Sequence, residues 1–174
     1  MNSTLVIILS IIAVIIVITA MYFSYNNKEI ALRKESEAQL GKIETVRDRM
    51  FQIIREKANV SSEYRKAFNE IYPKIIAGRY EHGGELMKWI QEANPEFDPS
   101  LYKDVMNAIE VQRTAFTSEQ NRMLDIINQR ATLIESYPSK WFVKNKSEIK
   151  YEPISTSDTK RVMATREDDY TFSY

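Results

Sequence analysis

The 174-residue chain contains no cysteine, one histidine, four glycines and five prolines. Without cysteine it can form no disulfide, no thiolate metal site and no cysteine nucleophile. The few glycines and prolines, together with many Glu, Lys, Arg, Ala, Ile and Met residues, favour long helices. The 24 acidic and 24 basic residues give zero formal charge, which provides no general argument for nucleic acid as a partner.

The single histidine limits the chemistry that the chain can support. His82 lies between Glu81 and Glu85, in a stretch that includes Gly83-Gly84. A His and a Glu three residues apart on a helix can share a metal, but such sites need two units and further inward carboxylates. The Gly-Gly pair also predicts a break in the helix. We therefore predict a solvent-facing turn, with a metal-dependent enzyme at these residues as the alternative.

Other patterns typical of catalysis are missing from the sequence. It has no phosphate-binding glycine loop, no dinucleotide-binding fingerprint and no nucleophile elbow around a serine. Basic and acidic residues alternate along the expected helices, as on a solvated surface. We predict that the chain is not an enzyme, holds no metal or cofactor, and does not bind nucleic acid.

What the chain does have is a long apolar stretch, Leu5 to Phe23. Its nineteen residues carry no charge and include seven isoleucines, three valines and two leucines. As a helix they extend ~28 Å, close to the ~30 Å hydrocarbon core of a bilayer. A cleaved secretory signal begins with basic residues, and residues 1–4 contain none. The stretch therefore predicts a permanent single-pass membrane helix.

Flanking charges predict the orientation of this helix. The N-terminal side has no Lys or Arg, whereas the C-terminal side has Lys28, Arg33, Lys34 and Lys42. Because positive flanks stay in the cytoplasm, we expect residues 1–4 outside the inner membrane and the rest of the chain in the cytoplasm. Aromatic residues at the cytoplasmic boundary fit an interfacial belt; they are Tyr22, Phe23 and Tyr25.

Residues 24–145 are expected to form one helical bundle. Apolar residues recur at alternating steps of three and four in the first long helix, which predicts a heptad seam. The seam consists of Ile43, Val46, Met50, Ile53, Lys57, Val60, Tyr64, Ala67 and Ile71. Because the spacing does not slip across residues 59–62, we expect one helix there, continuous with the membrane helix and kinked at Pro73.

A short helix over Glu85 to Ala93 and a second long helix over Pro99 to Tyr137 follow. Asp98 and Pro99 suit the start of the long helix as N-cap and first residue, and Pro138 ends it. Its seam again alternates three and four, through Tyr102, Val105, Ile109, Gln112, Phe116, Glu119, Met123, Ile126, Arg130, Leu133 and Tyr137. Helices joined in this way pack antiparallel.

We predict a register in which facing residue numbers sum to 176. Lys57 then meets Glu119, and this single polar layer fixes the alignment of the helices rather than performing catalysis. Arg130 falls opposite Val46 with no partner in the seam. It is expected to reach a nearby carboxylate or a third helix.

The segment after Pro138 contains Trp141 and Phe142 among lysines. We expect these aromatic residues to cap the open end of the bundle. The alternative is a basic, aromatic collar that contacts anionic lipid. The tail, residues 146–174, is polar and lacks periodicity, so irregular structure is expected; an aromatic motif that binds a partner is the alternative.

Three segments resemble the LemA family of bacterial membrane proteins. IYPKII at 71–76 is similar to the family's Leu-Ile-Pro-Asn-Leu-Val core, GRYEH at 78–82 to its Gly-Tyr-Ala-x-His-Glu element, and SYPS at 136–139 to its Ser-Phe-Pro-Ser ending. The chain departs from the family at Ala67-Phe68, where the family has two arginines. The resemblance implies an anchored antiparallel helical bundle with a short external N-terminus. It implies no activity, although some relatives organise membranes and bacteriophages carry short forms.

These observations support two different kinds of function. The first is a non-catalytic, membrane-anchored scaffold whose bundle faces the cytoplasm and binds a protein partner or a second copy of the chain. The second is a spanin-like lysis factor, whose coiled coil projects outside the inner membrane. The two hypotheses predict opposite topologies.

Overall fold

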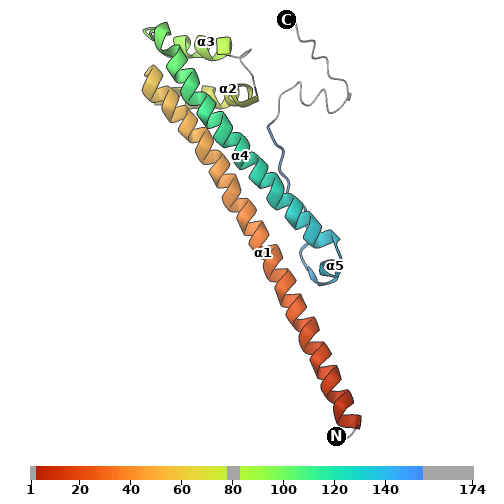
Figure 1. Ribbon diagram of the computed structural model, residues 1–174. Coiled ribbons are helices and arrows are strands. Elements are labelled where there is room, and N and C mark those ends of the chain that lie inside the picture. The colour runs from red at the N-terminus through yellow and green to blue at the C-terminus, as the bar shows by residue number, and fades with distance from the viewer. Residues whose placement is uncertain (1–2, 78–82, 155–174) are drawn as a thin grey trace, which may run out of the picture. The chain divides into compact units, whose positions relative to one another are not determined.

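The computed structural model describes residues 3–77 and 83–154, and its regular elements within these ranges are all helices (Figure 1). The five α-helices are α1 (Ser3–Ala58), α2 (Arg65–Ala77), α3 (Gly83–Ala93), α4 (Tyr102–Glu135) and α5 (Ser139–Phe142). The all-α prediction is confirmed. The described residues divide into two compact units, one of residues 3–42 and 119–151 and the other of residues 43–77, 83–118 and 152–154.

Helix α1 contains the apolar stretch and continues without a break to Ala58. It is long and apolar enough to cross a membrane, and no residue of its most apolar segment is buried against the rest of the chain. The hydroxyls of Ser10 and Thr19 donate to backbone carbonyls four residues earlier, at 2.9 and 2.8 Å. These polar groups are thus satisfied within the helix, as a bilayer requires. The predicted continuity of the apolar stretch with the following helix is confirmed.

In the first unit, α1 lies beside the C-terminal half of α4 (Figure 1). Their core contains Leu32, Ile126, Leu133 and Val143, with Tyr25 and Ile134 packed against it. Glu29 pairs with Arg130, Glu35 with Arg122, and Gln39 with Glu119. The numbers of these pairs sum to 157–159, so the helices are antiparallel.

The predicted register is therefore wrong. Glu119 accepts a 2.6 Å hydrogen bond from Gln39, which lies eighteen residues before Lys57 in α1. Lys57 itself is exposed. The error arises because the first helix was predicted to continue past residue 58. A longer first helix places the turn between the two long helices later in the chain, and this changes which residues face each other.

The end of α1 explains why the helix does not continue. Asn59 has φ 50°, the left-handed conformation that commonly follows a helix end. Asn94 donates from its side chain to the carbonyl of Ala58 at 2.9 Å, which satisfies one of the free carbonyls of the last turn. After Ser61 caps a short 3₁₀ turn, the chain enters α2 as a separate helix. The prediction of one helix across residues 59–62 is wrong.

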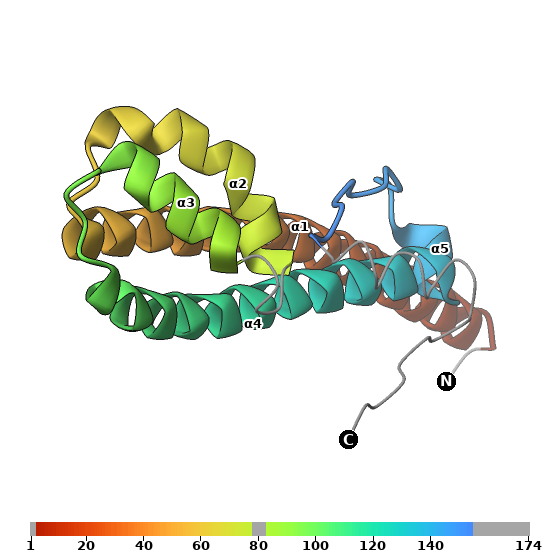
Figure 2. The same ribbon diagram turned by 90° about the horizontal axis from the view of Figure 1, so that it is seen from above.

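The second unit packs the end of α1, α2, α3 and the first half of α4 around aromatic rings. Phe68 on α2 lies 5.2 Å from Phe51, 5.7 Å from Tyr72 and 6.0 Å from Trp89, between ring centroids. Tyr72 meets Phe116 of α4 at 5.9 Å. Figure 2 shows α2 and α3 side by side. The buried face of α2 is thus Phe68, Tyr72 and Ile75, not the predicted Tyr64, Ala67 and Ile71.

The structure around α3 and α4 agrees closely with the predictions, with two differences. Pro99 begins a 3₁₀ turn rather than the long α-helix, and Gly83 and Gly84 lie within α3. Asp98 accepts a 2.8 Å hydrogen bond from the backbone N–H of Ser100, and Pro99 begins a 3₁₀ turn that leads into α4. The N-cap prediction is confirmed. Gly83 and Gly84, however, are the first residues of α3 and do not break it.

The irregular character of the tail is confirmed as far as residue 154. Residues up to 151 nevertheless belong to the first compact unit, beyond the predicted boundary at 145. The predictions for residues 155–174 lie outside the described residues.

Candidate functional site

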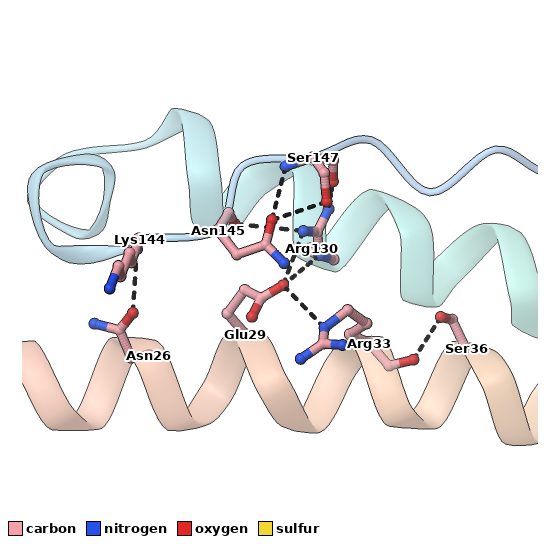
Figure 3. Close-up of polar contacts among 8 residues, drawn as sticks. All are labelled: Asn26, Glu29, Arg33, Ser36, Arg130, Lys144, Asn145 and Ser147. Carbon is pink, nitrogen blue, oxygen red and sulfur yellow. Dashed lines mark hydrogen bonds and ion pairs between the residues drawn. The ribbon is translucent and has the colours of Figure 1, made fainter.

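A buried ion pair joins α1 to α4 just beyond the apolar stretch. Arg130 donates to one carboxylate oxygen of Glu29 from Nε at 3.0 Å and from Nη2 at 2.8 Å. Both side chains are 3% exposed. The Nε of Arg33, one turn along α1, lies 3.7 Å from the same oxygen. Figure 3 shows the three side chains converging between the two helices.

Arg130 also binds the chain that follows α5. Its Nη1 donates to the carbonyl of Ser147 at 2.6 Å, and its Nη2 lies 3.4 Å from the carbonyl of Asn145 (Figure 3). The guanidinium fork therefore uses both its sides, one toward α1 and one toward the C-terminal segment. Because guanidinium is planar and permanently charged, this arrangement holds three parts of the chain in a fixed geometry.

Asn26 makes a second connection to the same segment, one turn nearer the apolar stretch. Its amide nitrogen donates to the carbonyl of Phe142 at 2.8 Å, and its amide oxygen accepts from the backbone N–H of Lys144 at 3.1 Å. One asparagine thus pairs with both a donor and an acceptor of the backbone, in the way a neighbouring strand does. We call Asn26, Glu29, Arg130, Asn145 and Ser147 the polar clamp.

The segment held by the clamp is fastened again further along. Tyr151 donates from its hydroxyl to the side-chain oxygen of Gln120 on α4, at 3.4 Å. Burial raises the pKa of the Tyr151 phenol above its ordinary value. Residues 142–151 are therefore tied to α1 and α4 at several points although they contain no helix beyond Phe142.

The electrostatic balance around the clamp is positive. Residues 24–35 and 135–148 contain six Lys or Arg residues and four carboxylates, which are Glu29, Glu35, Glu135 and Glu148. Arg130 adds a further cation, and its charge is opposed by Glu29. The exposed cations of the surface are Lys28, Lys34, Lys140, Lys144 and Lys146. This arrangement binds backbone and attracts anions, and it presents no nucleophile beside a base.

The predicted interaction residues have different surroundings. Glu119 is half-buried and bonds to Gln39 rather than to Lys57. Phe142 is half-buried and stacks on Tyr25 of α1 at 5.9 Å, so it closes this end of the first unit as expected. Trp141 is 75% exposed and does not cap the bundle.

The described residues provide no support for the alternative of a metal-dependent enzyme. Residues 3–77 and 83–154 contain no group of three His, Asp or Glu side chains placed to hold a metal ion. His82 and Glu81 lie outside the described residues.

Sequence reasoning missed the role of Glu29 and found Arg130 only as a residue without a partner. A signal for Glu29 was present. The heptad seam of α1 extends backward from Ile43 through buried residues at the same alternating spacing, and these are Gln39, Ser36, Leu32 and Glu29. Three of the four are polar, so an apolar pattern does not detect them.

No protein-family model, curated protein or solved structure matches this chain.

Proposed function

We propose that this protein is a non-catalytic, membrane-anchored scaffold whose helical bundle faces the cytoplasm. The observation that supports the proposal most directly is the continuity of α1 from the apolar stretch into the antiparallel helix pair of the first compact unit. A bundle attached in this way is not tethered by a linker. The direction of the membrane helix and the direction of the bundle's first helix are then the same.

The polar clamp gives such a scaffold mechanical integrity next to the bilayer. The buried Glu29–Arg130 ion pair specifies one alignment of α1 and α4, because any shifted alignment leaves a charge buried without a partner. The same contact ties down the segment around Ser147. The clamp thereby joins the part of α1 next to the apolar stretch to α4 and to the C-terminal segment.

Charge supports the cytoplasmic orientation. The five exposed lysines around the clamp come from two regions far apart in sequence, residues 28–34 and 140–146. Lys28 and Lys34 follow the membrane helix closely in sequence and favour the cytoplasmic side. The anionic lipid of that leaflet attracts each exposed cation near the surface by about 1 kcal/mol. The proposed likeness to the LemA family agrees with this topology.

Topology decides between this proposal and a spanin-like envelope factor. Two separate fusions after Tyr174 would report it: alkaline phosphatase, which is active only outside the cytoplasm, and green fluorescent protein, which fluoresces only in the cytoplasm. Fluorescence in the membrane fraction without phosphatase activity supports the proposal. Phosphatase activity without fluorescence rejects the cytoplasmic scaffold and favours the spanin-like function. The matched control is the same pair of fusions with residues 5–23 deleted, which should move the fluorescence to the soluble fraction.

The partner of the scaffold is a protein or a second copy of this chain. Mild detergent extraction of native membranes followed by co-purification identifies either one. A catalytic function would replace the proposal if the purified full-length chain carried a stoichiometric metal by elemental analysis and lost it in the His82→Ala variant.

A further inference from the structure

Two large aromatic side chains are exposed together at the turn between α4 and α5. Tyr137 is 65% exposed and Trp141 is 75% exposed. Their ring centroids lie 5.0 Å apart in an edge-to-face arrangement, and the ammonium of Lys140 lies 5.7 Å from the centroid of Tyr137. Ring pairs of this size usually lie in a core or at an interface, because their burial contributes strongly to stability.

This turn lies close to the end of the apolar stretch. The carbonyl of Phe142 accepts a hydrogen bond from Asn26, and the ring of Phe142 stacks on Tyr25. Asn26 is three residues beyond Phe23, which is ~4.5 Å along a helix axis. The turn is thus held within about one helical turn of the point where the apolar stretch ends.

The direction of α4 places the exposed rings on the membrane side of this contact. α4 runs antiparallel to α1, and its pairing continues from Arg122 opposite Glu35 to Arg130 opposite Glu29. The same progression brings Glu135, the last residue of α4, beside residue 24. Tyr137 therefore lies further toward the apolar stretch before the chain turns back at Phe142.

We propose that Tyr137 and Trp141 dock in the lipid headgroup region of the bilayer that α1 spans, with Lys140 and Lys144 facing lipid phosphates. Amphipathic rings of Trp and Tyr favour this depth, where the ring is in an apolar layer and its N–H or O–H remains hydrated. The lysines match the negative charge of the headgroups. The membrane then touches the protein at two points, α1 and the α4–α5 turn. The inference rests on the proposed anchoring by α1.

Quenching by brominated lipid tests the depth of Trp141. The full-length protein is reconstituted into vesicles of phosphatidylcholine and phosphatidylglycerol, with and without phosphatidylcholine brominated at the upper acyl carbons. The chain has two tryptophans, and Trp89 is 7% exposed in the second unit. Wild-type emission should fall in brominated vesicles, and Trp141→Phe should lose most of this quenching. In Trp89→Phe, where only Trp141 emits, we expect the quenching by brominated lipid to persist, because interfacial tryptophan lies at the headgroup level.

Flotation of the same vesicles separates the two possible failures. Protein that floats with the vesicles while the wild type and Trp141→Phe are quenched equally overturns the docking of the turn alone. Protein that does not float overturns the anchoring by α1 and this inference together. Trp89 is a core residue, so Trp89→Phe can disturb folding. Trp141 is exposed, so the comparison of wild type with Trp141→Phe tests the docking without that variant.

Discussion

Arg130 donates from two nitrogens to a single carboxylate oxygen of Glu29, 101 residues earlier in the chain, with both side chains almost completely buried. Its remaining donors reach the carbonyls of Asn145 and Ser147. One side chain therefore joins α1, α4 and the C-terminal segment. The consequences of removing it differ from those of removing a surface ion pair.

Substitution of Arg130 by Met should destabilise the protein by about 3–5 kcal/mol, because Glu29 is left buried without its main partner. Arg122→Met is the matched control. It removes an ion pair between the same two helices, but Arg122 and Glu35 are 52% and 42% exposed, so a loss below about 1 kcal/mol is expected. Chemical unfolding in detergent micelles, followed by circular dichroism, measures both. The double variant Glu29→Leu/Arg130→Met should regain most of the loss, and a double variant as unstable as the single one would contradict the account.

Removal of the Asn26 side chain should loosen the segment after α5. Asn26→Ala loses the bonds to the carbonyl of Phe142 and the N–H of Lys144. Trypsin should then cleave after Lys144 and Lys146 faster than in the wild type, because local opening exposes the backbone. Asn27→Ala is the control, since Asn27 is the adjacent asparagine and is exposed. Equal cleavage rates in the two variants would argue against the clamp.

The end of α1 depends on a left-handed residue. Asn59 has φ 50°, a conformation that β-branched residues disfavour, so Asn59→Val should destabilise the protein by about 1 kcal/mol. Asn59→Gly should be neutral or slightly stabilising, because glycine enters this region without a steric penalty. Urea unfolding of the two variants tests the prediction. A Val variant as stable as the Gly variant would mean that the helix end is set elsewhere.

The register of the two long helices can be tested by crosslinking, because the chain has no native cysteine. Glu35 and Arg122 form an ion pair in the structure. Cysteines at these two positions should therefore react with a short thiol-specific crosslinker. Cysteines at 57 and 119 should not. Gel mobility after protease digestion distinguishes linked from unlinked helices. Efficient linkage of 57 to 119 would restore the register predicted from the seams.

The start of α4 predicts a pH dependence. Hydrogen bonds from the backbone and side chain of Ser100 lower the pKa of Asp98 below its ordinary value of 3.8. The carboxylate therefore contributes stability above pH 3.8 that is lost as pH falls through the folded-state pKa. Asp98→Asn keeps a capping side chain but does not titrate. Its unfolding midpoint should fall less than that of the wild type between about pH 5 and pH 2, which is measured in urea at fixed ionic strength. Parallel curves would contradict this contribution of Asp98.

Much of the fold follows from local patterns in the sequence. The uncharged run from Leu5 to Phe23 specifies an apolar helix whatever lies around it. The seam of α4 is buried as predicted from Val105 to Leu133, apart from the half-buried Glu119. The pattern is reliable here because no Gly or Pro interrupts the helix. The Asp98-Pro99 cap acts within one turn, so sequence spacing alone identifies it.

The alignment of the helices was decided only by the tertiary structure. Steps of three and four remained regular through residues 59–62, so periodicity favoured a continuous helix. The chain instead ends α1 at Ala58, where a left-handed Asn59 and the side chain of Asn94, 36 residues after Ala58, satisfy the last turn. Such a long-range hydrogen bond leaves no local pattern.

That change shifts the register and places polar residues of one seam against polar residues of the other. Gln39 meets Glu119 and Glu29 meets Arg130, while Leu32 packs with Ile126. Local sequence patterns were sufficient to predict the apolar helix, the cap before α4 and the buried face of α4. Only the folded chain decided which residues meet, because a buried charge is stable solely opposite its partner, and that partner lies about a hundred residues away.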